Sequence, residues 1–371
     1  MMDLVLDENG LISDTDKRYE ELDKWYDLDR ADKEIELILS VPRKLWSKKF
    51  WFRLICAYNN NGDYEKSEEE LAKIEPHCEK AVEKARFHYY RGWLRGEKTQ
   101  NPVESLREYK KGLDADPDDT LDLTGRYEEC ETELQDIMDN MRSAVVHTVD
   151  IIKRRCALVP DDKKVEVDDE TFQLFLGFYQ GVVSLGFDNY FAKCKDDDRE
   201  KEMQLLNAYN ITDRDSFFEC IQNNQNMNQN VYLNDALAYM NGNPVFDIDE
   251  LEGDGRLCFL TYIEFVKTFI DELPDAGVIA WDIGEKIGLN RYAYACGILG
   301  NSDYVTGMLT LSDLLKEKFS SFEEYARSLI FGAALLMFQI SGMNVRKAKD
   351  FMCTVTKYFL DSRLPDTKWM K

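Results

Sequence analysis

Small and apolar residues recur along the first part of the chain at the intervals of amphipathic helices. Between residues 51 and 74 this set comprises Trp51, Leu54, Tyr58, Gly62, Tyr64, Ser67, Leu71 and Ile74. All but one of its steps are three or four residues long, and such steps place side chains on one face of a helix. The pattern predicts two amphipathic helices joined at Gly62, which together form a helical hairpin.

A second hairpin is predicted further along, and prolines close successive helices. Its second helix ends in VESLREYKKGLDADPDD, with Ser105, Tyr109, Gly112 and Pro117 at intervals of 4, 3 and 5. Pro42, Pro76 and Pro117 follow predicted helices at separations of 34 and 41 residues. Proline stops a helix because it lacks the amide donor. We interpret this spacing as an internal repeat with an incomplete first unit, whose units must stack to bury their apolar faces.

The remaining pattern predicts more helices and no sheet. A long helix is expected from Tyr127 to Leu158, where it would cover the last repeat, and a charged segment follows at 160–170. The second half shows no sustained two-residue alternation, and its first helix is expected from Phe172 to Leu185. The predicted fold is all-α, a helical hairpin stack followed by a helical second domain. We divide it into an N-terminal arm (1–16), repeats (17–126), a capping helix and linker (127–170) and a helical domain (171–371).

Charge narrows the choice of partners. The chain has 71 acidic and 47 basic residues, a net charge of -24. Binding to nucleic acid depends on Lys and Arg that neutralise phosphates, so nucleic acid and anionic membranes are disfavoured. An acidic groove along the repeats would attract basic segments. We therefore expect a protein or peptide partner, with net charge favouring a basic one.

Cysteines and the chain start indicate a reducing compartment. The nine cysteines are odd in number and contain no C-x-x-C pair, so no disulfide framework or zinc knuckle is expected. The start MMDLVLDENG lacks the basic segment and apolar run of a signal peptide. The longest apolar run, Leu329 to Ile340, has 12 residues, fewer than a membrane span needs. These features predict a cytoplasmic protein.

Catalytic motifs are missing from the sequence. His77, His88 and His147 are its three histidines, so residues 148–371 cannot form a Ser-His-Asp or Cys-His arrangement or a histidine-based metal site. No phosphate-binding glycine motif occurs. We therefore predict no catalytic residue, metal or cofactor, although paired carboxylates in the second domain would leave acid-base chemistry open.

One helix of the second domain holds the best-organised polar residues. In AGVIAWDIGEKIGLNRYAYACGIL, Asp282 and Arg291 flank a face that contains Trp281 and Tyr292. A core helix in which Asp282 pairs with Lys286, four residues on, is favoured over a ligand site. The binding candidates on this helix are Trp281, Asp282, Arg291 and Tyr292.

The second domain resembles a bacterial family designated domain of unknown function 1266. The resemblance rests on NAYNITDRDSFFECI, the helix quoted above, FSSFEEYARSLIFGAALLMF and Trp369 after a proline, and covers about Phe172 to Trp369. Characteristic positions of the family coincide with Trp281, Asp282, Arg291, Tyr292, Gly297 and Gly332. Glu285 stands where arginine is usual in the family, and Phe322 stands where tryptophan is usual. The negative charge of Glu285 counts against anion binding at that position. The resemblance implies a helical domain without an established activity.

The first half resembles tetratricopeptide modules of bacterial proteins, whose period is about 34 residues. The segments that carry the resemblance are EIELILSVP and FRLICAYNNNGDYEKSEEELAKIE. In such modules the first helices of the hairpins line the concave side. The resemblance thus implies groove contacts at Tyr58, Asn59, Asn60, Tyr89 and Arg91.

These observations favour a non-enzymatic interaction or adaptor protein that binds partners through its repeats. Tetratricopeptide modules often accompany domains encoded near toxin and immunity genes, so one alternative is an immunity-type antagonist of a bacterial toxin. The other is a carboxylate-based hydrolase or transferase in the second domain, near Asp282.

Overall fold

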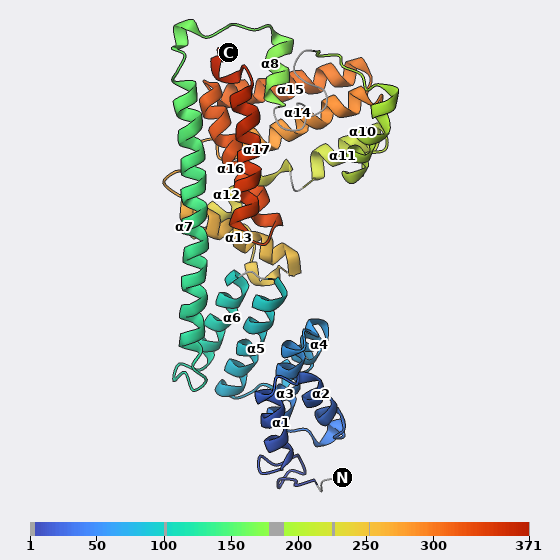
Figure 1. Ribbon diagram of the computed structural model, residues 1–371, viewed down its shortest axis with the longest axis vertical. Coiled ribbons are helices and arrows are strands. Elements are labelled where there is room, and N and C mark those ends of the chain that lie inside the picture. The colour runs from blue at the N-terminus through green and yellow to red at the C-terminus, as the bar shows by residue number, and fades with distance from the viewer. Residues whose placement is uncertain (1–3, 100–101, 178–188, 225–226, 252, 371) are drawn as a thin grey trace. The chain divides into compact units, whose positions relative to one another are not determined.

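Helices form almost all regular structure in the computed structural model (Figure 1). The structure describes residues 4–99, 102–177, 189–224, 227–251 and 253–370. Within these ranges there is no strand, and two isolated bridges join Leu6 to Ile12 and Val165 to Thr367. The predicted all-α fold is confirmed. The helix expected from Phe172 to Leu185 lies partly outside the described residues, and its described part belongs to α8 (Asp169–Leu176).

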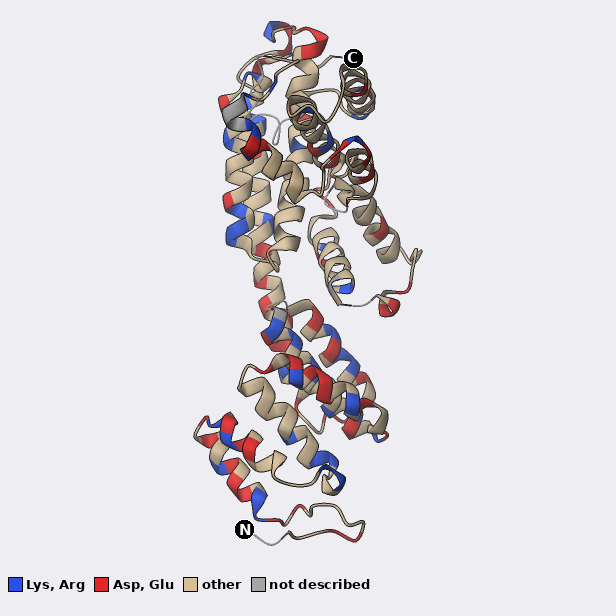
Figure 2. Ribbon diagram, turned by 90° about the vertical axis from the view of Figure 1, so that its right-hand side faces the viewer, with Lys and Arg blue, Asp and Glu red and all other residues tan. Residues whose placement is uncertain are grey.

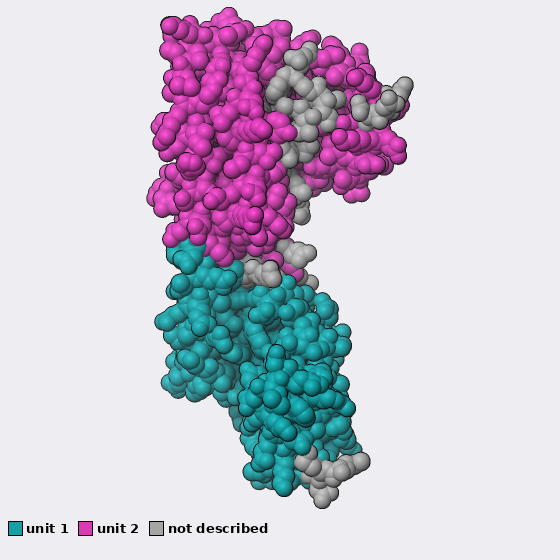
Figure 3. Space-filling view, viewed as in Figure 1, with its two compact units in different colours: residues 1–136 teal, residues 137–371 magenta. Residues whose placement is uncertain are grey.

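The chain divides into two compact units, residues 1–136 and 137–371 (Figure 3). The division falls within the long helix α7 (Leu123–Cys156), whereas the charge pattern places a boundary at 160–170. The four-part division drawn from the sequence stays a prediction.

Unit 1 consists of consecutive helical hairpins. Its helices are α1 (Arg18–Asp27), α2 (Ala31–Leu39), α3 (Lys48–Asn60), α4 (Tyr64–Ile74), α5 (Ala81–Thr99) and α6 (Pro102–Ala115), followed by the start of α7. Each helix from α1 to α5 packs against the next one, and α3 also packs against α5. The first helices of the hairpins are therefore α1, α3 and α5.

Local sequence explains where these helices begin and end. The Ser47 hydroxyl accepts a hydrogen bond from the Phe50 amide and caps α3. Gly62 has φ +74°, a conformation that favours glycine, at the turn between α3 and α4, as the spacing predicts. Pro42 and Pro76 lie at short 3-10 turns after α2 and α4, and Pro117 follows α6. The repeating prolines thus separate successive hairpins.

The core of unit 1 runs through the hairpins as three apolar clusters. The first contains Ile12 of the N-terminal arm and Phe50 of α3, and the second joins α3, α4 and α5. In the third, Leu123 is buried against α5 and α6, with Tyr127 packed beside it. The first turns of α7 therefore cover the last hairpin.

Unit 2 is a helical unit around α14. Besides the later part of α7 and α8, its helices are α10 (Asp196–Ala208), α11 (Arg214–Asn223), α12 (Gln229–Met240), α13 (Gly253–Phe269), α14 (Ile279–Ala295), α15 (Asn301–Lys318), α16 (Phe322–Ile340) and α17 (Val345–Asp361). Helices α8, α10, α12, α15 and α16 all pack on α14. Every residue of α14 except Ile279 and Lys286 is buried. Helix α14 is therefore the core helix that its spacing favours.

Glycines allow close approach to α14. A Cβ at Gly284 would lie 3.2 Å from both the Leu176 carbonyl oxygen and the Tyr325 hydroxyl. On α16, a Cβ at Gly332 would lie 2.2 Å from the Cβ of Trp281. The glycines therefore serve helix packing.

Within the described ranges, no helix is both long enough and apolar enough to cross a bilayer.

Candidate functional site

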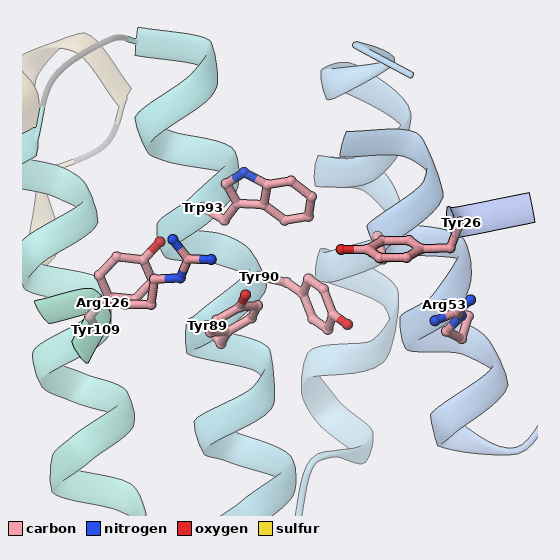
Figure 4. Close-up of a pocket in the computed structure, with 8 residues that line it drawn as sticks. Tyr26, Arg53, Tyr89, Tyr90, Trp93, Tyr109 and Arg126 are labelled. Carbon is pink, nitrogen blue, oxygen red and sulfur yellow. The ribbon is translucent and has the colours of Figure 1, made fainter. Parts of the chain in front are cut away.

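Side chains from successive hairpins line a hollow in unit 1 (Figure 4). Its volume is about 390 Å³. Its lining comprises Tyr26 of α1, Arg53 and Cys56 of α3, Tyr89, Tyr90 and Trp93 of α5, Tyr109 of α6 and Arg126 of α7. The first helices of all three hairpins therefore contribute to one site.

Two further hollows share walls with this one. A hollow of about 330 Å³ shares Arg53, Tyr89 and Tyr90, and a hollow of about 570 Å³ shares Trp93, Tyr109 and Arg126. The other residues that line the hollow of about 330 Å³ are Lys49, Phe52, Arg86 and Leu121. The other residues that line the hollow of about 570 Å³ are Gly96, Glu97, Pro102, Ser105, Glu129, Cys130 and Glu133. We call the three together the aromatic groove.

Ring contacts hold the wall of the groove in place. Tyr90 stacks on Phe52 with centroids 5.6 Å apart, and it meets Tyr89 edge-on at 5.2 Å. Trp93 lies 6.4 Å from Tyr90, while Tyr26 is 49% exposed on the facing helix. Rigid, partly exposed aromatic side chains are enriched at the centres of protein interfaces. The wall therefore offers apolar contact area that is already ordered.

One end of the groove is cationic. Lys49, Arg53, Arg86 and Arg126 line the first two hollows, and none of the described residues lining them is acidic. The first two hollows therefore do not have the acidic lining expected from net charge. Asp and Glu outnumber Lys and Arg along the chain, and both kinds occur on helices of both units (Figure 2). Net charge alone does not report how charges are distributed around one site.

The third hollow has the opposite charge. Glu97, Glu129 and Glu133 line it, and Glu129 pairs with Arg126 at 3.0 Å. We call Lys49, Arg53 and Arg86 the cationic end of the groove, and these three glutamates its acidic end.

A buried ion pair supports the cationic end. Nη2 of Arg53 lies 2.9 Å from Glu34 of α2 and 3.2 Å from Asp23 of α1. The Glu34 side chain is 1% exposed, and burial raises its pKa to about 7 although Arg53 opposes the shift. Close to neutral pH, Glu34 therefore compensates the charge of Arg53 only in part.

Of the five groove contacts predicted in unit 1, Tyr89 lines the groove. Tyr58 is buried in the first core cluster, and Asn59 is also buried. Asn60 is exposed next to the groove, with its amide 3.9 Å from the Cys56 sulfur. Arg91 lies 3.9 Å from Glu108 of α6. The structure thus does not bring these five residues together.

Sequence reasoning missed most of the groove lining. Arg86, Tyr90 and Trp93 follow one another at steps of four and three on α5 and all line the groove. This stripe is a legible signal, because residues with those spacings share a helix face. Tyr26 has no comparable signal, since only the packing of α1 brings it opposite α5.

The four candidates in unit 2 lie on α14 and are all buried. Trp281 is 1% exposed and meets the ring of Phe351 edge-on at 5.7 Å. Arg291 and Tyr292 are each 2% exposed, and burial lowers the pKa of Arg291. These residues are therefore placed to pack the core.

Asp282 has a structural partner that its sequence spacing did not indicate. Its two carboxylate oxygens accept hydrogen bonds of 2.9 and 2.8 Å from the backbone amides of Gln229 and Asn230, in the first turn of α12. Burial raises the pKa of Asp282 to about 6, while these two bonds oppose the rise. Lys286 donates to Asn228 at 3.0 Å, and its positive charge also lowers the pKa of Asp282. The hydrogen bonds of Asp282 and Lys286 are thus made with the start of α12, and the expected Asp282–Lys286 interaction is one of charge. A helix N-terminus favours a carboxylate at this place.

Metal ligands do not converge in the part of the chain that the structure describes. No group of three or more His, Cys, Asp or Glu side chains there is arranged to hold a metal ion.

Comparison with known families gives a match to part of unit 2. Residues 204–364 match the family described as protein of unknown function (DUF1266). The match lies inside the segment that resembles this family in sequence, and it supports a C-terminal domain of unknown function. Comparison with curated proteins and with solved structures gives no match.

Proposed function

We propose that this chain is a non-enzymatic interaction protein and that unit 1 is a tetratricopeptide-type module holding a segment of a partner protein in the aromatic groove. The single observation that carries the proposal is the composition of the groove wall. Helices α1, α3 and α5, the first helices of the hairpins, contribute side chains to one continuous set of hollows. Stacked helical repeats use such shared surfaces to bind extended segments.

The chemistry of the wall suits a protein segment. Tyr89, Tyr90 and Trp93 present apolar ring surface together with polar tips, a combination common at interfaces. Each apolar side chain of a partner that becomes buried there would contribute roughly 1.5–3 kcal/mol. A few such contacts, with the charged ends adding selectivity, are enough for a specific complex.

The inward position of the α14 residues also favours binding over catalysis. Asp282, the most promising carboxylate for acid-base chemistry, already accepts two backbone hydrogen bonds within the core of unit 2. A general acid or base must reach the proton that it transfers. Asp282 is directed to α12 instead.

Site-specific photocrosslinking tests the proposal. The photoreactive residue p-benzoylphenylalanine replaces Tyr26, which lines the groove and is 49% exposed, and the protein is irradiated in cells of its source organism. The matched control carries the same residue in place of Leu39 of α2, which is 54% exposed and is not among the described groove residues.

We expect a protein adduct of defined mass from position 26 that is absent from position 39. The additional change Trp93→Ala should weaken this adduct, because it removes ring surface from the groove wall. Equal adducts at both positions, or none at position 26, would refute the proposed function.

A further inference from the structure

Among the residues that the structure describes, Arg86 differs from the other arginines of α5 because no carboxylate lies within ion-pair distance of it. Arg91 lies within 4.0 Å of Glu75 and Glu108, and Arg95 lies 3.8 Å from Glu104 and also pairs with Glu68. No carboxylate of the described residues lies within 4.0 Å of the Arg86 guanidinium, which is 5.9 Å from the ring of Phe52. The chain has 71 acidic residues. A half-buried arginine on a groove wall is therefore unusual when no described carboxylate lies within 4.0 Å of it.

The other cations at this end are only partly compensated. Lys49 lies 3.6 Å from Asp14, and both side chains are about half exposed or more, so water competes for the pair. Arg53 shares its charge with Glu34 and Asp23 while remaining in the lining of both hollows. Three positive side chains thus converge on the hollow in which Tyr89 and Tyr90 supply apolar surface.

We infer that the groove binds an acidic segment of the partner protein, with its carboxylates at the cationic end and an aromatic or aliphatic side chain against Tyr90 and Trp93. The inference rests on the proposed function and specifies its partner. Arginine and carboxylate form charge-assisted hydrogen bonds, which are roughly twice as strong as neutral ones. The ring surface beside them adds apolar contact that a simple anion cannot use.

The acidic end of the groove gives the bound segment a direction. Glu97, Glu129 and Glu133 would repel a run of carboxylates extended over the whole groove. The acidic residues should therefore gather at one end of the bound segment, and neutral or basic residues should lie at the other end.

The net charge of -24 opposes the approach of an acidic segment but does not decide its binding. At physiological ionic strength, exposed charges more than about 8 Å apart are largely screened. Contacts within the groove determine the preference, although association should be slower than for a neutral segment.

Fluorescence anisotropy of a labelled peptide tests the inference. The probe contains four consecutive glutamates followed by Tyr, Phe, Gly and Ser, and two matched peptides carry Gln or Lys in place of the glutamates. Titrations use the full chain, the variant Arg86→Glu and the control Lys84→Glu. Lys84 is exposed on the same helix, is not among the described groove residues, and undergoes the same change of charge.

We expect the glutamate peptide to bind more tightly than the Gln and Lys peptides. Arg86→Glu should weaken it at least about tenfold, because a close attraction becomes a repulsion. Lys84→Glu should change its affinity less than about threefold, the scale of an exposed charge. Circular dichroism establishes that both variants are folded, and the milder change Arg86→Gln should give an intermediate loss.

The outcomes separate this inference from the proposed function. Preference for the Lys peptide, equal losses in both variants or no binding of the glutamate peptide would overturn the acidic specificity. If an adduct nevertheless forms at position 26 and depends on Trp93, the groove remains the partner site with a different ligand chemistry. If that adduct is absent as well, both proposals fail.

Discussion

Gly332→Ala should destabilise unit 2, because α14 and α16 have no space for one additional methyl group at their contact. The new Cβ would lie 2.2 Å from the Cβ and 2.8 Å from the Cγ of Trp281, while Val278 Cβ is 3.4 Å away. Carbon atoms pack at about 3.5–4.0 Å, so the helices would have to separate locally by more than about 1 Å. Because the first two atoms belong to the stem of Trp281, rotation of a flexible side-chain end cannot relieve the clash.

The expected loss follows from two opposing effects. Overpacking costs about 1–3 kcal/mol, and this rigid contact belongs at the upper limit. Alanine improves helix propensity by about 1 kcal/mol relative to glycine. The net decrease in the free energy of unfolding should therefore be about 2 kcal/mol.

Urea denaturation followed by near-ultraviolet circular dichroism and tryptophan fluorescence measures this loss. Because the chain has two compact units, each transition is fitted separately. The control is Gly255→Ala in α13, where no described atom beyond the adjacent residues and the backbone of that helix lies within 4 Å of the position that the new methyl group would take, and stability should rise by about 0.5–1 kcal/mol. An increase in stability for both variants would refute the close packing of Trp281 and with it the core assignment of this residue.

Three further changes test separate contacts. Asp282→Asn should lower the free energy of unfolding of unit 2 by about 1–3 kcal/mol, because one backbone amide of α12 loses its acceptor and the other keeps only a neutral one; an unchanged denaturation midpoint would contradict this. Burial raises the pKa of Glu34 from 4.5 to about 7, so the folded state retains a proton that the unfolded state releases, and stability should fall by about 2 kcal/mol as pH rises from 4.5 to 7. Glu34→Gln retains a side chain of similar size beside Arg53 and should flatten the stability–pH curve between pH 4.5 and 7. An unaltered slope there would show that the titrating group is not Glu34. Hydrogen peroxide, which accepts two electrons, should join Cys194 and Cys296, whose sulfurs are 3.6 Å apart; mass spectrometry of an alkylated, non-reduced digest should show the linked peptides, and two alkylated thiols would exclude the bond.

Periodicity predicts the hairpin of α3 and α4, whereas the first unit, which the proline spacing indicates to be incomplete, contains both α1 and α2. The apolar steps through Leu54 and Leu71 correspond to α3 and α4, and Gly62 adopts the positive φ that the turn between them requires. These features are local, because helix faces and turns depend on residues a few positions apart. The division of the chain within α7 has no such signal, since a continuous helix carries no composition change at Asp136.

The candidate site was less accessible to sequence reasoning because its parts come from different helices. The position of Tyr89 on a first helix predicts a groove contact, but the groove is also lined by Tyr26 and Arg126, which are 100 residues apart in sequence. The local charge was missed for the same reason, since -24 is a property of the whole chain and the cationic end is a property of three side chains. Spacing predicts a partner for Asp282 within its own helix, whereas the backbone amide of Gln229 in α12, 53 residues away in sequence, donates a hydrogen bond to its carboxylate.

Sequencing of the peptide crosslinked at position 26 tests the central claim most directly. The photoreactive residue replaces Tyr26, the adduct is digested, and tandem mass spectrometry identifies the attached partner segment. The account predicts one recurring segment with clustered Asp or Glu next to an aromatic or aliphatic residue, absent when the photoreactive residue replaces Leu39. Recovery of many unrelated peptides, or of the same peptides from both positions, would contradict a specific partner site in the groove.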